Sequence, residues 1–148
     1  MIDIAALEAL VDTEFPVGTF TIEEHEHWLC ADAVLSPPLP DGIAHPMYGF
    51  YAAIAGMGKS LDEVFADAGA TAADGPMFGE SGLEFREPLR VGATYSVTGR
   101  YVDAVRKRGK RTGVFDIVVM QVEVVDETGA VAVVSTNSFI YPRREAEA

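Results

Sequence analysis

The sequence predicts an α+β fold in which one curved antiparallel sheet wraps a long central helix. The helix is predicted at 46–69, where bulky apolar residues recur at the spacing of one helical face and alanine and glycine fill the positions between them. A helix that is apolar nearly all round needs other elements around it. Four predicted strands follow it, at residues 79–85, 93–105, 112–125 and 130–141. Because these strands follow one another and do not alternate with helices, a parallel βαβ arrangement is disfavoured.

The residues before the central helix predict smaller elements. We expect a short helix, a strand, a second helix and a stiff proline-rich loop at residues 2–15, 17–22, 23–34 and 35–44. In the second helix, Trp28, Leu29 and Cys30 are predicted to face inward. Pro46 suits the first position of the central helix, because the N–H that proline lacks would have no partner there.

Two connections between the later strands have recognisable sequences. Residues 126–129 predict a hairpin turn in which Gly129 takes a positive φ. The second and third strands are joined by a basic hexamer at 106–111, which holds five of the eleven lysines and arginines. The strands are longer than usual, which suits a sheet that bends around a helix.

Composition and charge limit the classes of function. A chain of 148 residues with 49% apolar residues predicts one globular domain over 1–148. The net charge of −12 argues against binding to nucleic acid or to an anionic membrane. No apolar run reaches the roughly 18 residues that a membrane span needs, and the acidic start is unlike a signal peptide, so we expect a cytoplasmic protein. With a single cysteine and no dinucleotide, P-loop or metalloprotease motif, the sequence predicts no metal site and no cofactor.

Two segments carry a resemblance to a known family. The helix-opening segment IAHPMYGFYAAIAGMG and the strand segment GESGLEFREPLRVGATYSVTGRYVDAV resemble the MaoC-like hotdog hydratases and dehydratases. The strand segment matches the family pattern at five positions, Phe85, Pro88, Leu89, Val91 and Gly92. The resemblance covers about residues 15–142. It implies a single hotdog fold and the hydration of an enoyl thioester, or the reverse dehydration, with coenzyme A or acyl carrier protein as the carrier.

The chain departs from this family at its catalytic pair. The family pattern is an Asp-His dyad written D-x-N-P-x-H, in a segment before the central helix. Here Asp41 and His45 are four residues apart and the Asn-Pro is absent. His45 aligns better with the histidine that opens the family's helix, which leaves the dyad segment largely deleted between Val34 and Ile43.

Three residues are candidates for acid/base chemistry. His45 opens the central helix, where a neutral imidazole could position or protonate a thioester-linked substrate. Asp41 could orient His45 or act as the base, although a solvated turn aspartate before Gly42 would look the same. Glu80 opens the strand after the helix, and the resemblance implies that this position faces the acyl pocket. The alternative for Glu80 is a solvated carboxylate on an edge strand.

Four further residues are candidates for substrate binding. Tyr48 and Tyr51 share a helical face and could donate to a thioester carbonyl, or they could be core aromatics. The resemblance places Gly79 and Ser81 beside Glu80 at the opening of the strand. His25 and His27 lie two residues apart on a predicted helix and therefore point to different sides, which argues against a metal site.

The sequence leaves three functions open. The first is a MaoC-like hydratase or dehydratase of an acyl thioester. The second is a non-catalytic hotdog subunit or ligand-binding module that has lost the dyad, and the third is a hotdog acyl-CoA thioesterase with Glu80 or Asp41 activating water. We expect a homodimer, because a single hotdog leaves an edge strand open. The hexamer at 106–111 is a solvated hairpin tip, a site for the phosphates of coenzyme A, or a surface for an acidic carrier protein.

Overall fold

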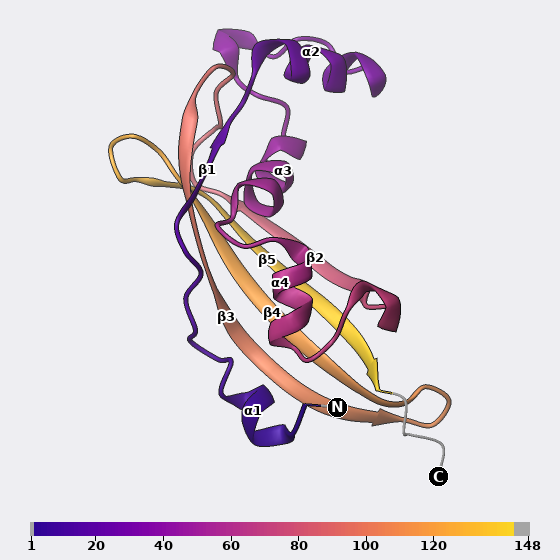
Figure 1. The fold of residues 1–148 in the computed structure, drawn as a ribbon. Coiled ribbons are helices and arrows are strands. Elements are labelled where there is room, and N and C mark those ends of the chain that lie inside the picture. The colour runs from indigo at the N-terminus through magenta and orange to yellow at the C-terminus, as the bar shows by residue number, and fades with distance from the viewer. Residues whose placement is uncertain (1, 144–148) are drawn as a thin grey trace.

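The computed structural model describes residues 2–143. Its helices and strands, in chain order, are α1 (Ile4–Glu8), β1 (Gly18–Thr21), α2 (Glu24–Ala33), α3 (Met47–Gly56), α4 (Leu61–Asp67), β2 (Met77–Phe85), β3 (Thr94–Gly109), β4 (Gly113–Val125) and β5 (Val131–Arg143). Short 3₁₀ turns lie at Pro40–Gly42 and Ala72–Asp74. Figure 1 shows α3 and α4 on one face of a bent sheet, with α2 beyond one end of it.

One antiparallel sheet contains all five strands in the order β1-β3-β4-β5-β2. This arrangement confirms the predicted α+β fold with a curved sheet. The strand β2 lies at one edge, hydrogen-bonded to β5 alone among the described strands, and all of its residues are exposed. An open edge strand of this kind is a ready surface for another chain.

The predicted central helix is two helices. The chain leaves the helical conformation at Met57, and α4 begins after Ser60, whose side chain forms a capping box with Glu63. Gly58 lies against the backbone of the N-terminal segment, where an added Cβ would be 2.0 Å from the carbonyl oxygen of Pro16. The break therefore lets the chain cross close to another backbone segment, which a continuous helix would prevent.

The core lies between α3 and the concave face of the sheet. Ala52 and Ala53 are fully buried there, and Gly56 contacts the side chains of β1 and β3 so closely that any Cβ would clash. Small residues thus let the helix approach the sheet. The helix is not buried all round, because Met47 and Tyr51 are 40% and 38% exposed. A single sheet covers only one side of the helix.

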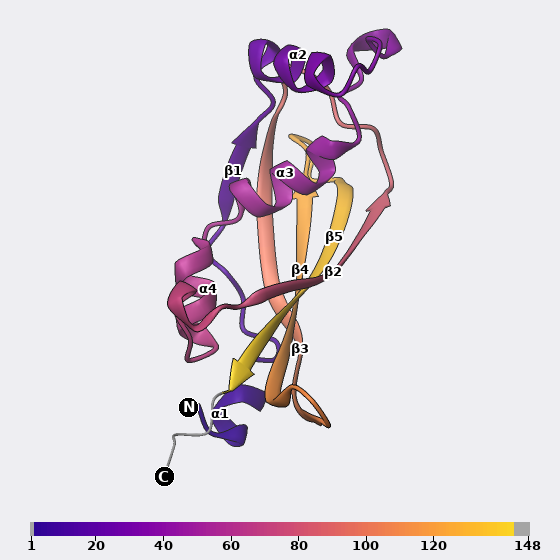
Figure 2. The same cartoon turned by 90° about the vertical axis from the view of Figure 1, so that its right-hand side faces the viewer.

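The helix α2 is less buried than the sequence indicated. Trp28 and Leu29 are 63% and 57% exposed, so the prediction that both face inward is wrong. Only Cys30 packs against the core. Successive helical residues point about 100° apart, so three in a row cannot all face one side. In both views α2 lies beyond the end of the sheet (Figure 2), where little of the chain can cover it.

Part of the basic hexamer belongs to the sheet. Arg106 lies in β3 and donates to the fully buried carboxylate of Asp116 in β4, with Nε–Oδ1 at 2.7 Å. Arg143 of β5 donates to the same carboxylate at 2.7 Å. The two arginines also donate to backbone carbonyls of Ile2 and Gly69. This ion cluster ties the N-terminal segment and the end of α4 to the far end of the sheet.

Candidate functional site at the start of α3

The loop that precedes α3 is held by the connection between β2 and β3. Ala44 N–H donates to the carbonyl of Leu89 at 2.7 Å, and Ile43 forms an isolated bridge with Arg90. The Arg90 guanidinium donates to the backbone carbonyl of Asp41 at 2.8 Å. These contacts fix the point where α3 begins.

His45 caps α3 with its own side chain. Its Nδ1 accepts a hydrogen bond from the N–H of Met47 at 3.2 Å. A neutral imidazole that accepts at Nδ1 carries its proton on Nε2. Within residues 2–143 no carboxylate is hydrogen-bonded or ion-paired to this ring. The orienting partner that an Asp-His dyad supplies is therefore not on His45 in this chain.

His27 is the residue at this site that the sequence reasoning missed. It reaches from α2, and its Nε2 accepts a hydrogen bond from the backbone N–H of His45 at 2.9 Å. Its ring also packs on Tyr48, with the ring centroids 5.3 Å apart. The EHEH pattern drew attention to His27 only as a metal ligand, since a contact across eighteen residues leaves no local signal.

The backbone donors at the start of α3 all have acceptors within the chain. His27 accepts from His45 N–H, and His45 Nδ1 accepts from Met47 N–H. The N–H groups of Tyr48 and Gly49 donate to the carbonyls of His45 and Pro46 at 2.9 and 3.0 Å. Unpaired N–H groups at a helix start can polarise a thioester carbonyl. At the start of α3 these N–H groups already have acceptors.

Asp41 does not form a dyad with His45 in this structure. It lies in the short 3₁₀ turn with φ of 56°, a left-handed conformation that aspartate tolerates better than most residues. The residue is exposed, and its backbone carbonyl, not its carboxylate, makes the contact with Arg90. The turn leads the chain into α3, but the Asp41 carboxylate forms no hydrogen bond with the His45 imidazole.

The two tyrosines of α3 have different surroundings. Tyr48 is buried, and its ring meets that of Tyr51 edge to face at 5.6 Å. Burial raises the pKa of the Tyr48 phenol, and the nearby Cys30 and Glu26 raise it further. The Tyr48 phenol is therefore protonated at neutral pH, and its ring lies beside that of His27.

The predicted residues on β2 lie apart from the start of α3. The backbone N–H of Glu80 donates to Ser138 Oγ at 2.8 Å, while the residue itself is exposed. Ser81 Oγ donates to Asn137 Oδ1 of β5 at 2.8 Å, and Asn137 Nδ2 donates in turn to Ser135 Oγ on the same strand. Gly79 allows β2 to approach β5, because a Cβ there would lie 2.6 Å from Ser138 Oγ. The structure shows no contact between these residues and His45.

An apolar groove of about 330 Å³ opens beside the start of α3. Leu39, Pro46 and Phe85, the last residue of β2, are among the residues that line it. Phe85 is exposed although it is a large aromatic residue. A groove of this composition suits an apolar ligand.

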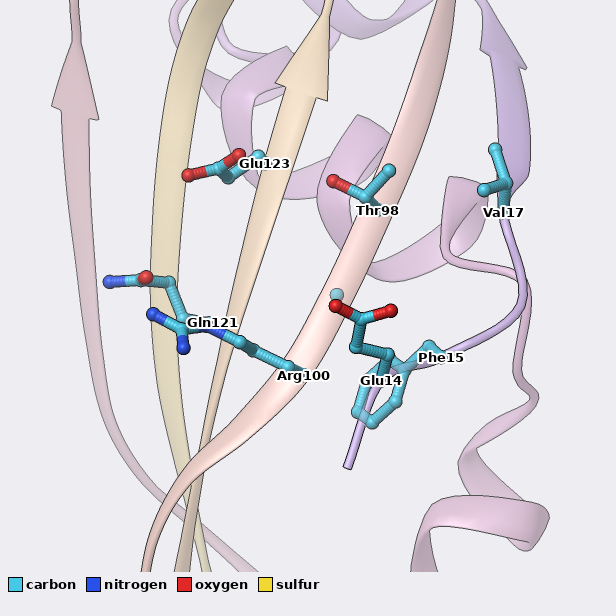
Figure 3. A pocket seen from close by; sticks show the side chains of 8 residues that line it. Glu14, Phe15, Val17, Thr98, Arg100, Gln121 and Glu123 are labelled. Carbon is cyan, nitrogen blue, oxygen red and sulfur yellow. The ribbon is translucent and has the colours of Figure 1, made fainter. Parts of the chain in front are cut away.

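A separate hollow lies on the face of the sheet away from the helices. It has a volume of about 450 Å³, and Figure 3 shows that polar side chains from β3 and β4 reach into it. Arg100, Gln121 and Glu123 line it, with Glu14 from the N-terminal segment. No residue predicted as functional lies in this hollow.

Among residues 2–143 no three side chains of the metal-binding types come together. No helix in the same part of the chain is both long enough and apolar enough to cross a membrane.

Comparison with solved structures identifies the fold. The ChsH1–ChsH2 complex from Mycobacterium tuberculosis contains a chain that superposes with a TM-score of 0.65 and 12% identity, over 96% of this chain and 91% of that one. The HadBC (3R-hydroxyacyl-ACP dehydratase) complex of the same organism gives 0.63 and 13%, over 88% and 98%. A MaoC-like dehydratase from Rhodospirillum rubrum gives 0.62 and 16%, over 91% and 94%. No protein-family model and no curated protein matches the sequence. The chain therefore has the hotdog fold, in the form that MaoC-like dehydratases share.

Proposed function

We propose that this chain is the non-catalytic half of a MaoC-like hydratase or dehydratase, and that a second hotdog chain supplies the acid/base pair for an acyl thioester. The observation that carries the proposal is the closed start of α3. His27 and His45 occupy the backbone donors there, and no carboxylate holds His45. A hydration needs a base for water and a donor for the developing enolate. At this helix start the basic nitrogen of His45, Nδ1, already accepts a hydrogen bond, and the backbone donors already have acceptors.

The open edge of the sheet supports pairing with a second hotdog chain. Every residue of β2 is exposed, and its outer backbone groups have no strand beside them in the described chain. Phe78, Leu83 and Phe85 give this edge an apolar side. Two of the similar solved structures are complexes named for two different chains. A homologous partner accounts for this edge better than a copy does, because a copy would also lack the dyad.

The substrate class follows from the groove and from the fold. The apolar groove beside Pro46 and Phe85 suits the acyl chain or carrier arm of an enoyl or 3-hydroxyacyl thioester. In this arrangement the present chain contributes part of the wall, and the partner contributes the chemistry. Coenzyme A and acyl carrier protein are both compatible with it.

A second candidate is that the chain is itself a hydratase. The observation in its favour is that His45 is half-buried between two residues that line the groove, Ala44 and Pro46, and that its Nε2 is bound to no group among residues 2–143. A thioesterase has less support, because neither Asp41 nor Glu80 contacts His45 or lines the groove.

An absorbance assay of crotonyl-CoA hydration separates the two candidates. We expect no hydration by the purified chain, and hydration when it is mixed with a dyad-bearing MaoC-like chain from the same cell. Native mass spectrometry of the active mixture should show a complex of the two chains. Hydration by the purified chain alone, lost in His45→Ala, would overturn the proposal in favour of the hydratase.

A further inference from the structure

An apolar groove with an acidic rim lies between α2 and the loop that follows it. Its volume is about 350 Å³, and its lining includes Trp28, Leu39, Glu24 and Asp32. The indole of Trp28 is 63% exposed although it is the only tryptophan. Within residues 2–143 the carboxylates of Glu24 and Asp32 enter no hydrogen bond or ion pair. An exposed indole between two unpaired carboxylates is a surface that binds cationic side chains, by ion pairing and by cation–π contact.

A set of cations that form no ion pair within residues 2–143 lies at the opposite end of the molecule. Lys107, Lys110 and Arg111 are exposed on the hairpin between β3 and β4. Arg106 does not belong to this set, because Asp116 holds it. Figure 1 shows this hairpin and α2 at opposite ends of the sheet. With Arg108 there are four exposed cations within residues 107–111, which is unusual in a chain with a net charge of −12.

We infer that the hairpin of one copy of this chain docks in the α2 groove of a second copy. The two features are complementary in charge, and their positions at opposite ends prevent a chain from filling its own groove. Two copies that lie side by side in opposite directions bring each hairpin to the other copy's groove. A two-fold axis then gives two identical contacts and a closed dimer. Arginine and lysine side chains pair with Glu24 and Asp32 and cover the Trp28 indole.

This contact is separate from the proposed catalytic pairing. The hairpin belongs to β3 and β4 and the groove to α2, so neither lies on the outer edge of β2. The inference therefore does not rest on the proposed function. Self-association tests it, whereas turnover with a partner tests the function.

Reciprocal charge reversal tests the inference. One variant carries Lys110→Glu and Arg111→Glu, so that the tip of its hairpin and its groove both carry carboxylates. The other carries Glu24→Lys and Asp32→Lys, so that both are basic. We expect analytical ultracentrifugation to show at least a tenfold rise in the dimer dissociation constant for each variant alone. An equimolar mixture should restore a one-to-one dimer, because both contacts then join opposite charges.

Matched controls separate this contact from general charge effects. Arg100→Glu reverses one exposed cation that lies neither in the lining of the α2 groove nor on the hairpin, and it should leave the dimer unchanged. Lys110→Glu alone makes the same change in net charge and should weaken the dimer. In the wild type, raising the salt concentration should weaken the dimer, as screening of surface ion pairs requires. Trp28→Ala should weaken it without any change of charge. A wild type that is monomeric, or dimeric regardless of salt, would overturn the inference, and so would a mixture that fails to associate.

Discussion

Replacing His27 tests the closed start of α3 most directly. In His27→Ala the backbone N–H of His45 loses its acceptor, which costs about 1 kcal/mol for a half-buried donor. The ring contact with Tyr48 is lost as well, at roughly 1 kcal/mol. We therefore expect the free energy of unfolding to fall by about 2 kcal/mol. For a chain of this length that corresponds to a melting temperature lower by roughly 4–8 °C.

His25 provides the matched control for this prediction. It lies on the same helix two residues away, is exposed, and makes no hydrogen bond in the described chain. His25→Ala should change the free energy of unfolding by less than about 0.5 kcal/mol. Urea denaturation followed by circular dichroism measures both variants. If the two lose the same stability, then His27 does not hold the start of α3 and the structural argument fails.

The same variant bears on the proposed function. Once His27 is removed, the N–H of His45 is available to a ligand. We expect His27→Ala to bind acetyl-CoA more tightly than the wild type in isothermal titration calorimetry, and His25→Ala to bind like the wild type. Equal affinities for all three proteins would show that His27 does not limit access to the helix start.

Two further predictions concern stability. Burial would raise the pKa of the Asp116 carboxyl, but hydrogen bonds from its two arginine partners outweigh burial and hold it below the ordinary value of 3.8. Asp116→Asn should lower the free energy of unfolding at neutral pH by about 3 kcal/mol, because it leaves the buried Arg143 and the partly buried Arg106 without a counter-charge. Glu84→Gln in an exposed pair should cost under about 1 kcal/mol. A carboxyl whose pKa is lower in the folded than in the unfolded state stabilises the fold at pH values above its unfolded pKa, and this stabilisation is lost as the pH falls through the folded pKa. The difference in unfolding free energy between the wild type and Asp116→Asn should therefore be smaller at about pH 3 than at about pH 7. A difference that stays constant would contradict the assignment. Gly58→Ala should cost about 1–3 kcal/mol because its Cβ would meet the carbonyl of Pro16, and Gly82→Ala, which has open space, is the control in the same thermal melts.

Much of the fold could be predicted because the signals are local. Alternating apolar residues predicted the strands, and the turn at residues 126–129 placed the end of β4 and the start of β5 to within one residue. The capping box of Ser60 and Glu63 is also visible in the sequence, and it would have divided the central helix correctly. The uninterrupted helical spacing of apolar residues across 57–60 obscured it.

The sequence by itself determined the fold class, the hotdog resemblance and the position of His45 at a helix start, because each depends on neighbouring residues. Only the tertiary structure decided what meets His45. His27 is eighteen residues away, and Asp41, four residues away, is turned aside by a left-handed backbone. The same holds for Asp116, whose burial is possible only because β3 and β5 bring arginines to it. Contacts between distant segments leave no local pattern, so the chemistry of this site depended on the packing of the whole chain.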